Sequence, residues 1–391
     1  MKPTRLAVSI VPVAWLLMLL PTATTPQTDV PRTGEQATMQ QLLRDLSSVF
    51  RLTLDEGEFE DPANRDQILS WLYSLAGNAE QMGAHGESAN PSTDYFRRSL
   101  ARDANEAVIR FRQDQYEGTR FLVDQLMINC YGCHSRMPSD RLFQLGDRFL
   151  KETDAATLSA EDRARLQVTM RQFEDALVTY EQYFASQEVS AGKIAMSSAF
   201  QNYLRICLRV EDDCERAIET FDVFRQRPDV PPYLDTRLSL WTKDLRQLSK
   251  KRKEAERDPL TRGRELIRDA QYRNAFPNDP QGMVRLIAAT GYLHRYLQSS
   301  PTDTNRLAEA YYLLGVAESY ISPTYWRSQT DALLERAIQT SPRSVYGRMA
   351  LSFLEDYTIS GYTGSSGVNI PPDVQERLDE LRSLVESENE K

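Results

Sequence analysis

The chain has 391 residues, of which 41% are hydrophobic and 26% are charged. At roughly 100–200 residues per domain, this length allows two or three packed units. With only 17 Gly and 19 Pro, the composition excludes collagen and low-complexity disorder. Its 47 basic and 56 acidic residues give a net charge of −9, which disfavours nucleic acid and anionic membrane as partners. Because polar and apolar residues alternate with helical spacing, we expect an all-α protein.

Residues 1–25 have the form of a secretory signal peptide. Lys2 and Arg5 precede an apolar stretch from Leu6 to Leu20, and small residues follow Pro21. This stretch is shorter than the roughly 20 residues needed to span hydrocarbon. The sequence therefore predicts export to the periplasm, an oxidising compartment, with no membrane insertion after cleavage.

Residues 36–138 are predicted to form four amphipathic helices with short connections. The second has a strong start signal, Asp61 as N-cap followed by Pro62, and the fourth ends at Pro138. The first carries one apolar stripe, composed of Met39, Leu42, Leu43, Leu46, Val49 and Phe50. Four helices of this kind favour an antiparallel bundle.

Beyond Pro138 the pattern changes to helix pairs, several closed by a proline (Pro228, Pro301 and Pro342). We divide this part into residues 141–258 and 259–391, with a loop over 359–373 before the last helix. The predicted helices span 141–152, 160–186, 191–210, 213–227, 233–257, 260–273, 281–299, 303–321, 324–340, 343–358 and 372–388.

Several of these pairs resemble divergent tetratricopeptide repeats. The matching positions are Phe173, Ala176, Leu177 and Tyr180, then Ala217, Ile218 and Phe221, and nearly a whole unit over 307–342. The resemblance implies an α-solenoid whose concave face binds peptides or proteins. The alternative is a set of helical hairpins that pack on one another without a ligand.

The fourth predicted helix carries Cys130-Tyr131-Gly132-Cys133-His134, a C-x-x-C-H motif typical of c-type haem attachment. Two thiols three residues apart reach the two vinyl groups on one porphyrin edge and form thioethers. His134 lies four residues after Cys130 on the same helical face, so its imidazole can coordinate the iron. We therefore expect one covalent haem c on Cys130 and Cys133, with His134 as the axial ligand.

Three other uses of this motif are less favoured. A thioredoxin-like pair needs a βαβ context, whereas both flanks here are helical. A structural zinc site needs four ligands, and the chain has only three His and four Cys in all. A disulfide within a helix has poor geometry.

The position of the motif, at the end of the last helix of a four-helix unit, resembles that of the class II c-type cytochromes, the cytochrome c prime group. That resemblance implies that the first helix covers the distal haem face. Met39 would then be the second axial ligand, with Leu42, Leu43 and Leu46 closing the pocket, and two copies could form a homodimer. The open alternatives are that Met39 is only a core residue, or that His85 ligates from its loop.

Cys207 and Cys214 form a second pair, at the end of one predicted helix and the start of the next. A disulfide there would staple the hairpin after export.

Two functions follow from these expectations. The first is a monohaem electron carrier that docks a redox partner protein through its helical repeats. The second is a haem-containing scaffold or NO/CO sensor with five-coordinate iron. An enzyme such as a peroxidase is disfavoured, because the sequence offers no identifiable distal acid and base pair.

Overall fold

The structure, a computed structural model, describes residues 34–84, 91–136, 158–252, 258–271, 280–322 and 329–386. Within these ranges the regular structure is helical except for two short strands, β1 (Thr363–Gly364) and β2 (Gly367–Val368). The strands pair antiparallel, with Thr363 opposite Val368. The prediction of an all-α fold is therefore confirmed. The predicted signal peptide, the predicted helix over 141–152 and His85 lie outside the described residues.

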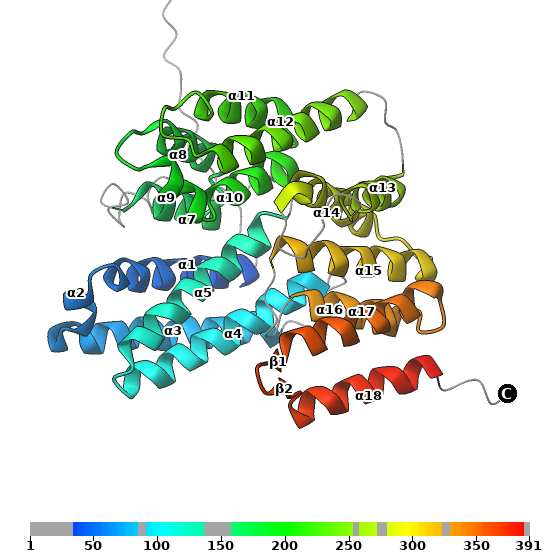
Figure 1. Cartoon of the computed structure of the whole chain (residues 1–391). Helices are drawn as coiled ribbons and strands as arrows, with labels where there is room; N and C mark the ends of the chain where they lie inside the picture. Colours follow the sequence, from blue (N-terminus) through cyan, green and yellow to red (C-terminus); the bar gives the residue numbers. More distant parts are fainter. Residues whose placement is uncertain are drawn as a thin grey trace, which may run out of the picture.

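The N-terminal part is drawn blue to cyan in Figure 1. It comprises α1 (Gly34–Thr53), α2 (Glu56–Glu60), the 3₁₀ turn η1 (Pro62–Asn64), α3 (Arg65–Ala84), α4 (Pro91–Arg112) and α5 (Tyr116–His134). α3 packs against α1 and α4, and α5 packs against α4 and α1. Their apolar stripes meet in one hydrophobic cluster that buries Leu46, Leu72 and Leu126. These four long helices therefore share a core.

Polar side chains fix the turns between these helices. Asp61 accepts a hydrogen bond from the Ala63 N–H at 2.8 Å, but the element it caps is η1, and α3 begins only at Arg65. Asp114, between α4 and α5, has a φ of 57°, a left-handed conformation that Asp tolerates better than most residues. Its carboxylate pairs with Arg65 at 2.6 Å, which ties this turn to the start of α3.

Most of the remaining helices pack as pairs of neighbours in the chain. α7 packs on α8, α11 on α12, α13 on α14, α15 on α16, and α16 on α17. A second, larger hydrophobic cluster runs through them. Their bounds are α7 (Ala160–Thr169), α8 (Phe173–Ala185), α9 (Ala191–Met196), α10 (Ala199–Arg205), the π-helical turn η3 (Ile206–Val210), α11 (Cys214–Phe224), α12 (Pro232–Arg252), α13 (Pro259–Gln271), the 3₁₀ turn η4 (Pro280–Gly282), α14 (Met283–Gln298), α15 (Thr304–Ile321), α16 (Gln329–Thr340), α17 (Val345–Gly361) and α18 (Pro372–Glu386).

Three further predicted elements differ from the structure. The predicted helix over 160–186 is two helices, because Arg171 adopts a φ of 60° and turns the chain between α7 and α8. The predicted helix over 191–210 breaks at Ser197, where the backbone is extended, before α10 begins. The predicted loop over 359–373 contains the end of α17 and the ribbon of β1 and β2.

The N-terminal helices and the later ones interlock. Leu166 and Met170, from and just after α7, belong to the first hydrophobic cluster, whereas Tyr131 of α5 belongs to the second. α16 returns to contact α4, where Arg336 pairs with Asp94 at 3.7 Å, and Figure 1 shows the two helices side by side. The C-terminal end of α5 therefore lies where the two clusters meet.

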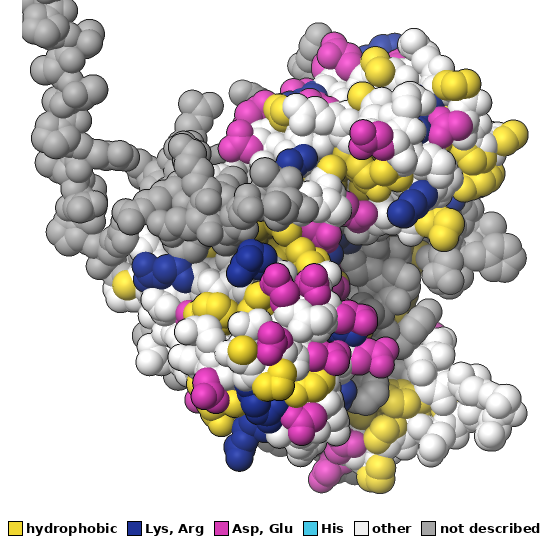
Figure 2. All heavy atoms as spheres, turned by 90° about the vertical axis from the view of Figure 1, so that its left-hand side faces the viewer, with side chains coloured by type: hydrophobic (Ala, Val, Ile, Leu, Met, Phe, Trp, Pro, Cys, Tyr) yellow, Lys and Arg dark blue, Asp and Glu magenta, His cyan; other side chains and the backbone are white. Residues whose placement is uncertain are grey.

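The surface is mixed in character. Figure 2 shows acidic and basic side chains spread over one face, with small groups of hydrophobic side chains between them. Among the described residues, no helix combines the length and the apolarity that a membrane crossing requires.

Candidate functional site

Cys130, Cys133 and His134 occupy the last turn of α5. Helical hydrogen bonding continues to the end of the motif, since the Ser135 N–H donates to the Tyr131 carbonyl at 3.0 Å. Residues four apart in such a turn lie on one side of the helix. Cys130 and His134 therefore share a face of α5, as the motif predicts.

His134 is held in a defined tautomer. Its Nδ1 lies 2.7 Å from the Thr169 carbonyl oxygen, at the end of α7. A carbonyl oxygen only accepts, so Nδ1 carries the proton and neutral His134 keeps its lone pair on Nε2. Burial lowers the pKa of His134 to about 4, and the positive charge of Arg171 acts in the same direction. At neutral pH the imidazole is therefore uncharged, with a lone pair on Nε2 that can bind a metal ion. The hydrogen bond to the Thr169 carbonyl orients the ring, as is common for metal-ligating histidines.

The two motif thiols are poor thiolates. Both are partly buried and neither is recorded in a disulfide. Burial raises the pKa of Cys130 to about 12, and the neighbouring Cys133 adds to that rise. Burial also raises the pKa of Cys133, although Arg136, Arg97 and Arg171 oppose the rise. Redox-active cysteine pairs work with a lowered thiol pKa, so these surroundings do not favour a thioredoxin-like use.

The other predicted pocket residues belong to, or pack against, the first hydrophobic cluster. Cys130 packs against this cluster from α5, and the partly buried Met39 packs against it from α1. Leu42, Leu43 and Leu46 lie within it, each at most 5% exposed. The predicted haem-pocket residues and Cys130 therefore contribute to the same hydrophobic cluster.

The second cysteine pair lies elsewhere. Cys207 is in η3 and Cys214 is the first residue of α11, and both side chains are buried. The Asp213 N–H donates to the Cys207 carbonyl at 2.7 Å, which closes the turn between them. The structure records no bond between the two sulfurs, so the disulfide stays a prediction.

Two anchors of the motif could not be found from its sequence. One is the Thr169 carbonyl, a main-chain group with no residue signature. The other is Tyr131, whose side chain points away from the cysteines and donates to the Asn202 carbonyl at 2.7 Å. The sequence marks Tyr131 only as a tyrosine between the two motif cysteines, and its burial is a property of the fold.

Gly132 is required for close packing behind the motif. A Cβ atom at this position would lie 2.8 Å from Cε1 of Phe96, whose ring also packs under the Arg136 guanidinium. We expect Gly132→Ala to reduce the free energy of unfolding by about 1–3 kcal/mol, as overpacked sites do. Gly77→Ala in α3, where nothing lies within 4 Å, is the matched control and should stabilise by about 0.5–1 kcal/mol. Equal effects of the two changes in urea denaturation would contradict the close contact.

The lowered pKa of His134 predicts that the chain without a bound cofactor is less stable in acid. As pH falls below the ordinary pKa of 6.5, His134 takes up a proton in the unfolded chain, whereas in the folded chain it takes up that proton only near pH 4. With respect to His134, the free energy of unfolding is therefore highest above pH 6.5 and falls by on the order of 3 kcal/mol towards pH 4. In protein made without haem attachment, His134→Asn should flatten this slope. If His134→Asn left the pH dependence of the free energy of unfolding unchanged over this range, His134 would not be the source of the acid sensitivity.

The donor set fits a covalently attached haem. Such a haem uses two thiols, which form thioether bonds to its vinyl carbons, and one imidazole nitrogen, which coordinates the iron. Only Nε2 of His134 therefore needs to reach the iron. Within the described ranges, no group of three or more His, Cys, Asp or Glu side chains is placed to hold a metal ion, whereas a structural zinc ion requires four donors.

No family model, curated protein or solved structure matches the chain.

Proposed function

We propose that this chain is a monohaem c-type cytochrome, with haem bound covalently to Cys130 and Cys133 and His134 as an axial ligand. The observation that carries the proposal is the hydrogen bond from His134 Nδ1 to the Thr169 carbonyl. It places the lone pair of the imidazole on Nε2, where it can coordinate the iron. When bound, the haem supplies an iron that exchanges one electron or, with an open position, takes a gas molecule.

The residues of this chain would divide the work of holding that group. The two thiols would fix the porphyrin edge to the last turn of α5, and His134, oriented by the Thr169 carbonyl, would ligate the iron. Tyr131, between the cysteines, ties this turn to α10 through its bond to Asn202. The apolar cluster with Leu42, Leu43 and Leu46 would exclude water from the distal side. The haem-bearing unit would then be the bundle of α1, α3, α4 and α5, similar to class II cytochromes.

Electron transfer is the function we favour. Met39 lies on the helix that the class II resemblance assigns to the distal side, and it packs against the same cluster as Cys130. A thioether ligand there would fill the sixth position of the iron and suit an electron carrier. We propose further that the chain is exported to the periplasm and that α7 to α18 form a divergent tetratricopeptide-like solenoid that docks a redox partner protein.

The absorption spectrum of the exported holoprotein, oxidised, reduced, and reduced under CO, tests this proposal. Ligation by Met39 predicts a low-spin ferrous spectrum that CO does not change. Met39→Ala should then become high-spin and CO-sensitive, whereas Met196→Ala, at a side chain that is 87% exposed, should not. A CO-sensitive wild-type spectrum would reject Met39 as a ligand and move the assignment to a gas sensor or scaffold.

A further inference from the structure

A polar cavity lies on another face of α5 from the motif thiols. Its volume is about 590 Å³, within the range of small-molecule sites. α4, α5, α7, α10, η3, α15 and α16 all contribute to its walls. Asn129 and Gly132 of α5 line it, whereas Cys130 faces the first hydrophobic cluster. The cavity is therefore separate from the proposed haem site.

Five arginines and three acidic residues line the cavity, which gives it an excess of two positive charges. Two of the arginines have a carboxylate of their own. Arg102 pairs with Asp103 at 2.7 Å, and Arg165 pairs with Asp124 at 2.5 Å. The excess charge consequently belongs to the other three arginines.

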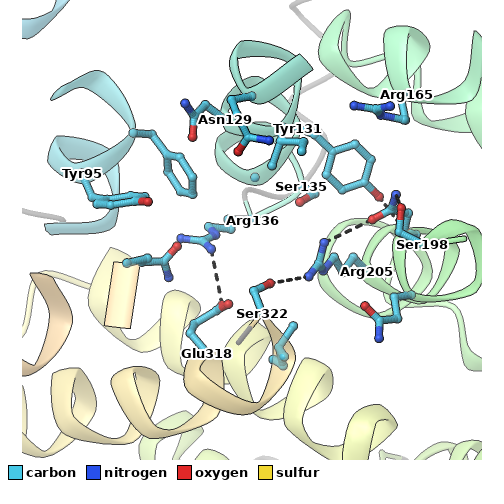
Figure 3. A pocket seen from close by; sticks show the side chains of 18 of the residues that line it. Tyr95, Asn129, Tyr131, Ser135, Arg136, Arg165, Ser198, Arg205, Glu318 and Ser322 are labelled. Atoms are coloured by element: carbon cyan, nitrogen blue, oxygen red, sulfur yellow. Dashed lines mark hydrogen bonds and ion pairs between the residues drawn. The ribbon is translucent and has the colours of Figure 1, made fainter. Parts of the chain in front are cut away.

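Those three, Arg136, Arg205 and Arg209, have one lining carboxylate between them, that of Glu318. Its Oε1 lies 3.0 Å from Arg209 and 3.4 Å from Arg136. Arg205 instead donates to neutral oxygens, one on Asn202 at 3.1 Å and one on Ser322 at 2.8 Å. Figure 3 shows Arg136 directed to Glu318 and Arg205 directed to Ser322 within the same cavity.

Several hydrogen-bond donors of this wall are buried without a partner among the described residues. They are Nε and Nη1 of Arg136, Nε of Arg205, Nε2 of Gln329 and the hydroxyl of Ser135. The Arg136 side chain is only 8% exposed, so its unused N–H groups are deeply desolvated. A buried donor without an acceptor costs about 1–3 kcal/mol, and more when it is charged. An acceptor-rich ligand would remove that cost.

We propose that this cavity binds a small organic dianion, a dicarboxylate or a phosphate monoester, through Arg136 and Arg205 with Ser135 and Gln329. Two negative charges match the excess charge of the wall. The planar guanidinium fork suits the paired oxygens of carboxylates and phosphates equally well, so both classes meet the same recognition chemistry. The proposal does not depend on the haem, because it uses a different face of α5.

Calorimetric titration of the purified full-length protein with succinate and with glycerol 3-phosphate tests the site. We expect at least one of them to bind with a Kd below about 1 mM. Binding of succinate alone assigns a dicarboxylate, binding of glycerol 3-phosphate alone assigns a phosphate monoester, and binding of both supports the shared anion chemistry. Uncharged succinamide should not bind.

Variants locate the bound anion. Arg136→Gln and Arg205→Gln should each weaken binding by about tenfold or more, because each removes charge-assisted hydrogen bonds. Arg246→Gln, at a 55% exposed arginine on α12, should leave binding unchanged. If circular dichroism shows that Arg136→Gln does not fold, Arg205→Gln, at the less buried position, tests the proposal alone. No heat with either dianion up to about 10 mM, binding of succinamide as tight as succinate, or wild-type affinity in the Arg205 variant would overturn the proposal.

Discussion

Replacing Cys130 and Cys133 together by Ser is expected to abolish covalent haem attachment. A hydroxyl does not form the thioether that joins each cysteine to a vinyl carbon, so haem should be extractable from the double variant by acid and organic solvent. Each single variant should keep at most one thioether, which shifts the reduced absorption bands because one vinyl group stays unsaturated. Gel staining for haem peroxidase activity after denaturation measures the loss.

The other cysteines of the chain provide the control. Cys214→Ser changes a buried thiol at the start of α11, outside the motif, and should retain covalent haem at the wild-type level. Loss of covalent haem in the Cys214 variant equal to that in the motif variant would show that the staining reports folding and not attachment.

Replacing Glu318 by Ala is expected to reduce the free energy of unfolding by about 3–5 kcal/mol, the usual cost of breaking a buried ion pair from one side. Glu318 is 4% exposed, and its carboxylate is shared by Arg209 and Arg136. Its removal would leave two buried guanidinium groups without a carboxylate. Equilibrium unfolding in urea measures the change.

A surface pair provides the matched control. Glu380→Ala removes the exposed partner of Arg377 in α18 and should cost no more than about 1 kcal/mol. A Glu318→Ala variant no less stable than the Glu380→Ala variant would contradict the role given to the buried cluster.

The same carboxylate predicts an acid limb of the stability curve. Burial alone would raise the pKa of Glu318, but Arg209, Arg136 and Arg205 together lower it to about 2. A folded-state pKa below the ordinary 4.5 means that this contribution is complete above pH 4.5 and is lost as pH falls towards 2. Glu318→Gln should therefore remove the part of the acid sensitivity that lies below the range assigned to His134.

Local signals in the sequence were sufficient for the fold class and for many helix starts. Asp213 caps α11 by accepting from the Arg216 N–H at 3.0 Å, close to the predicted start at 213. The apolar stripe of the first predicted helix does lie in the first hydrophobic cluster. The two predicted helices over 160–186 and 191–210 were wrong because the chain breaks there without Gly or Pro at the break. Arg171 takes a left-handed conformation between α7 and α8 that tertiary packing imposes and that no local pattern marks.

The candidate site likewise combines residues that the local sequence predicts with contacts that it does not predict. The spacing of Cys130, Cys133 and His134 could be read directly, because all three depend on one helical turn. The partner of His134 could not be read, since the Thr169 carbonyl is 35 residues away on another helix. The anion cavity was equally hidden, because Arg209 and Glu318 meet across 109 residues of chain. Contacts of that range are set by how helices pack and not by local composition.

Covalent haem binding is tested by the intact mass of the exported protein under denaturing conditions. We expect the mass of the mature chain plus one haem, and after proteolysis we expect the haem on the peptide that contains Cys130 and Cys133. A mass equal to that of the chain alone, from cells that attach haem to a control cytochrome, would contradict covalent haem binding.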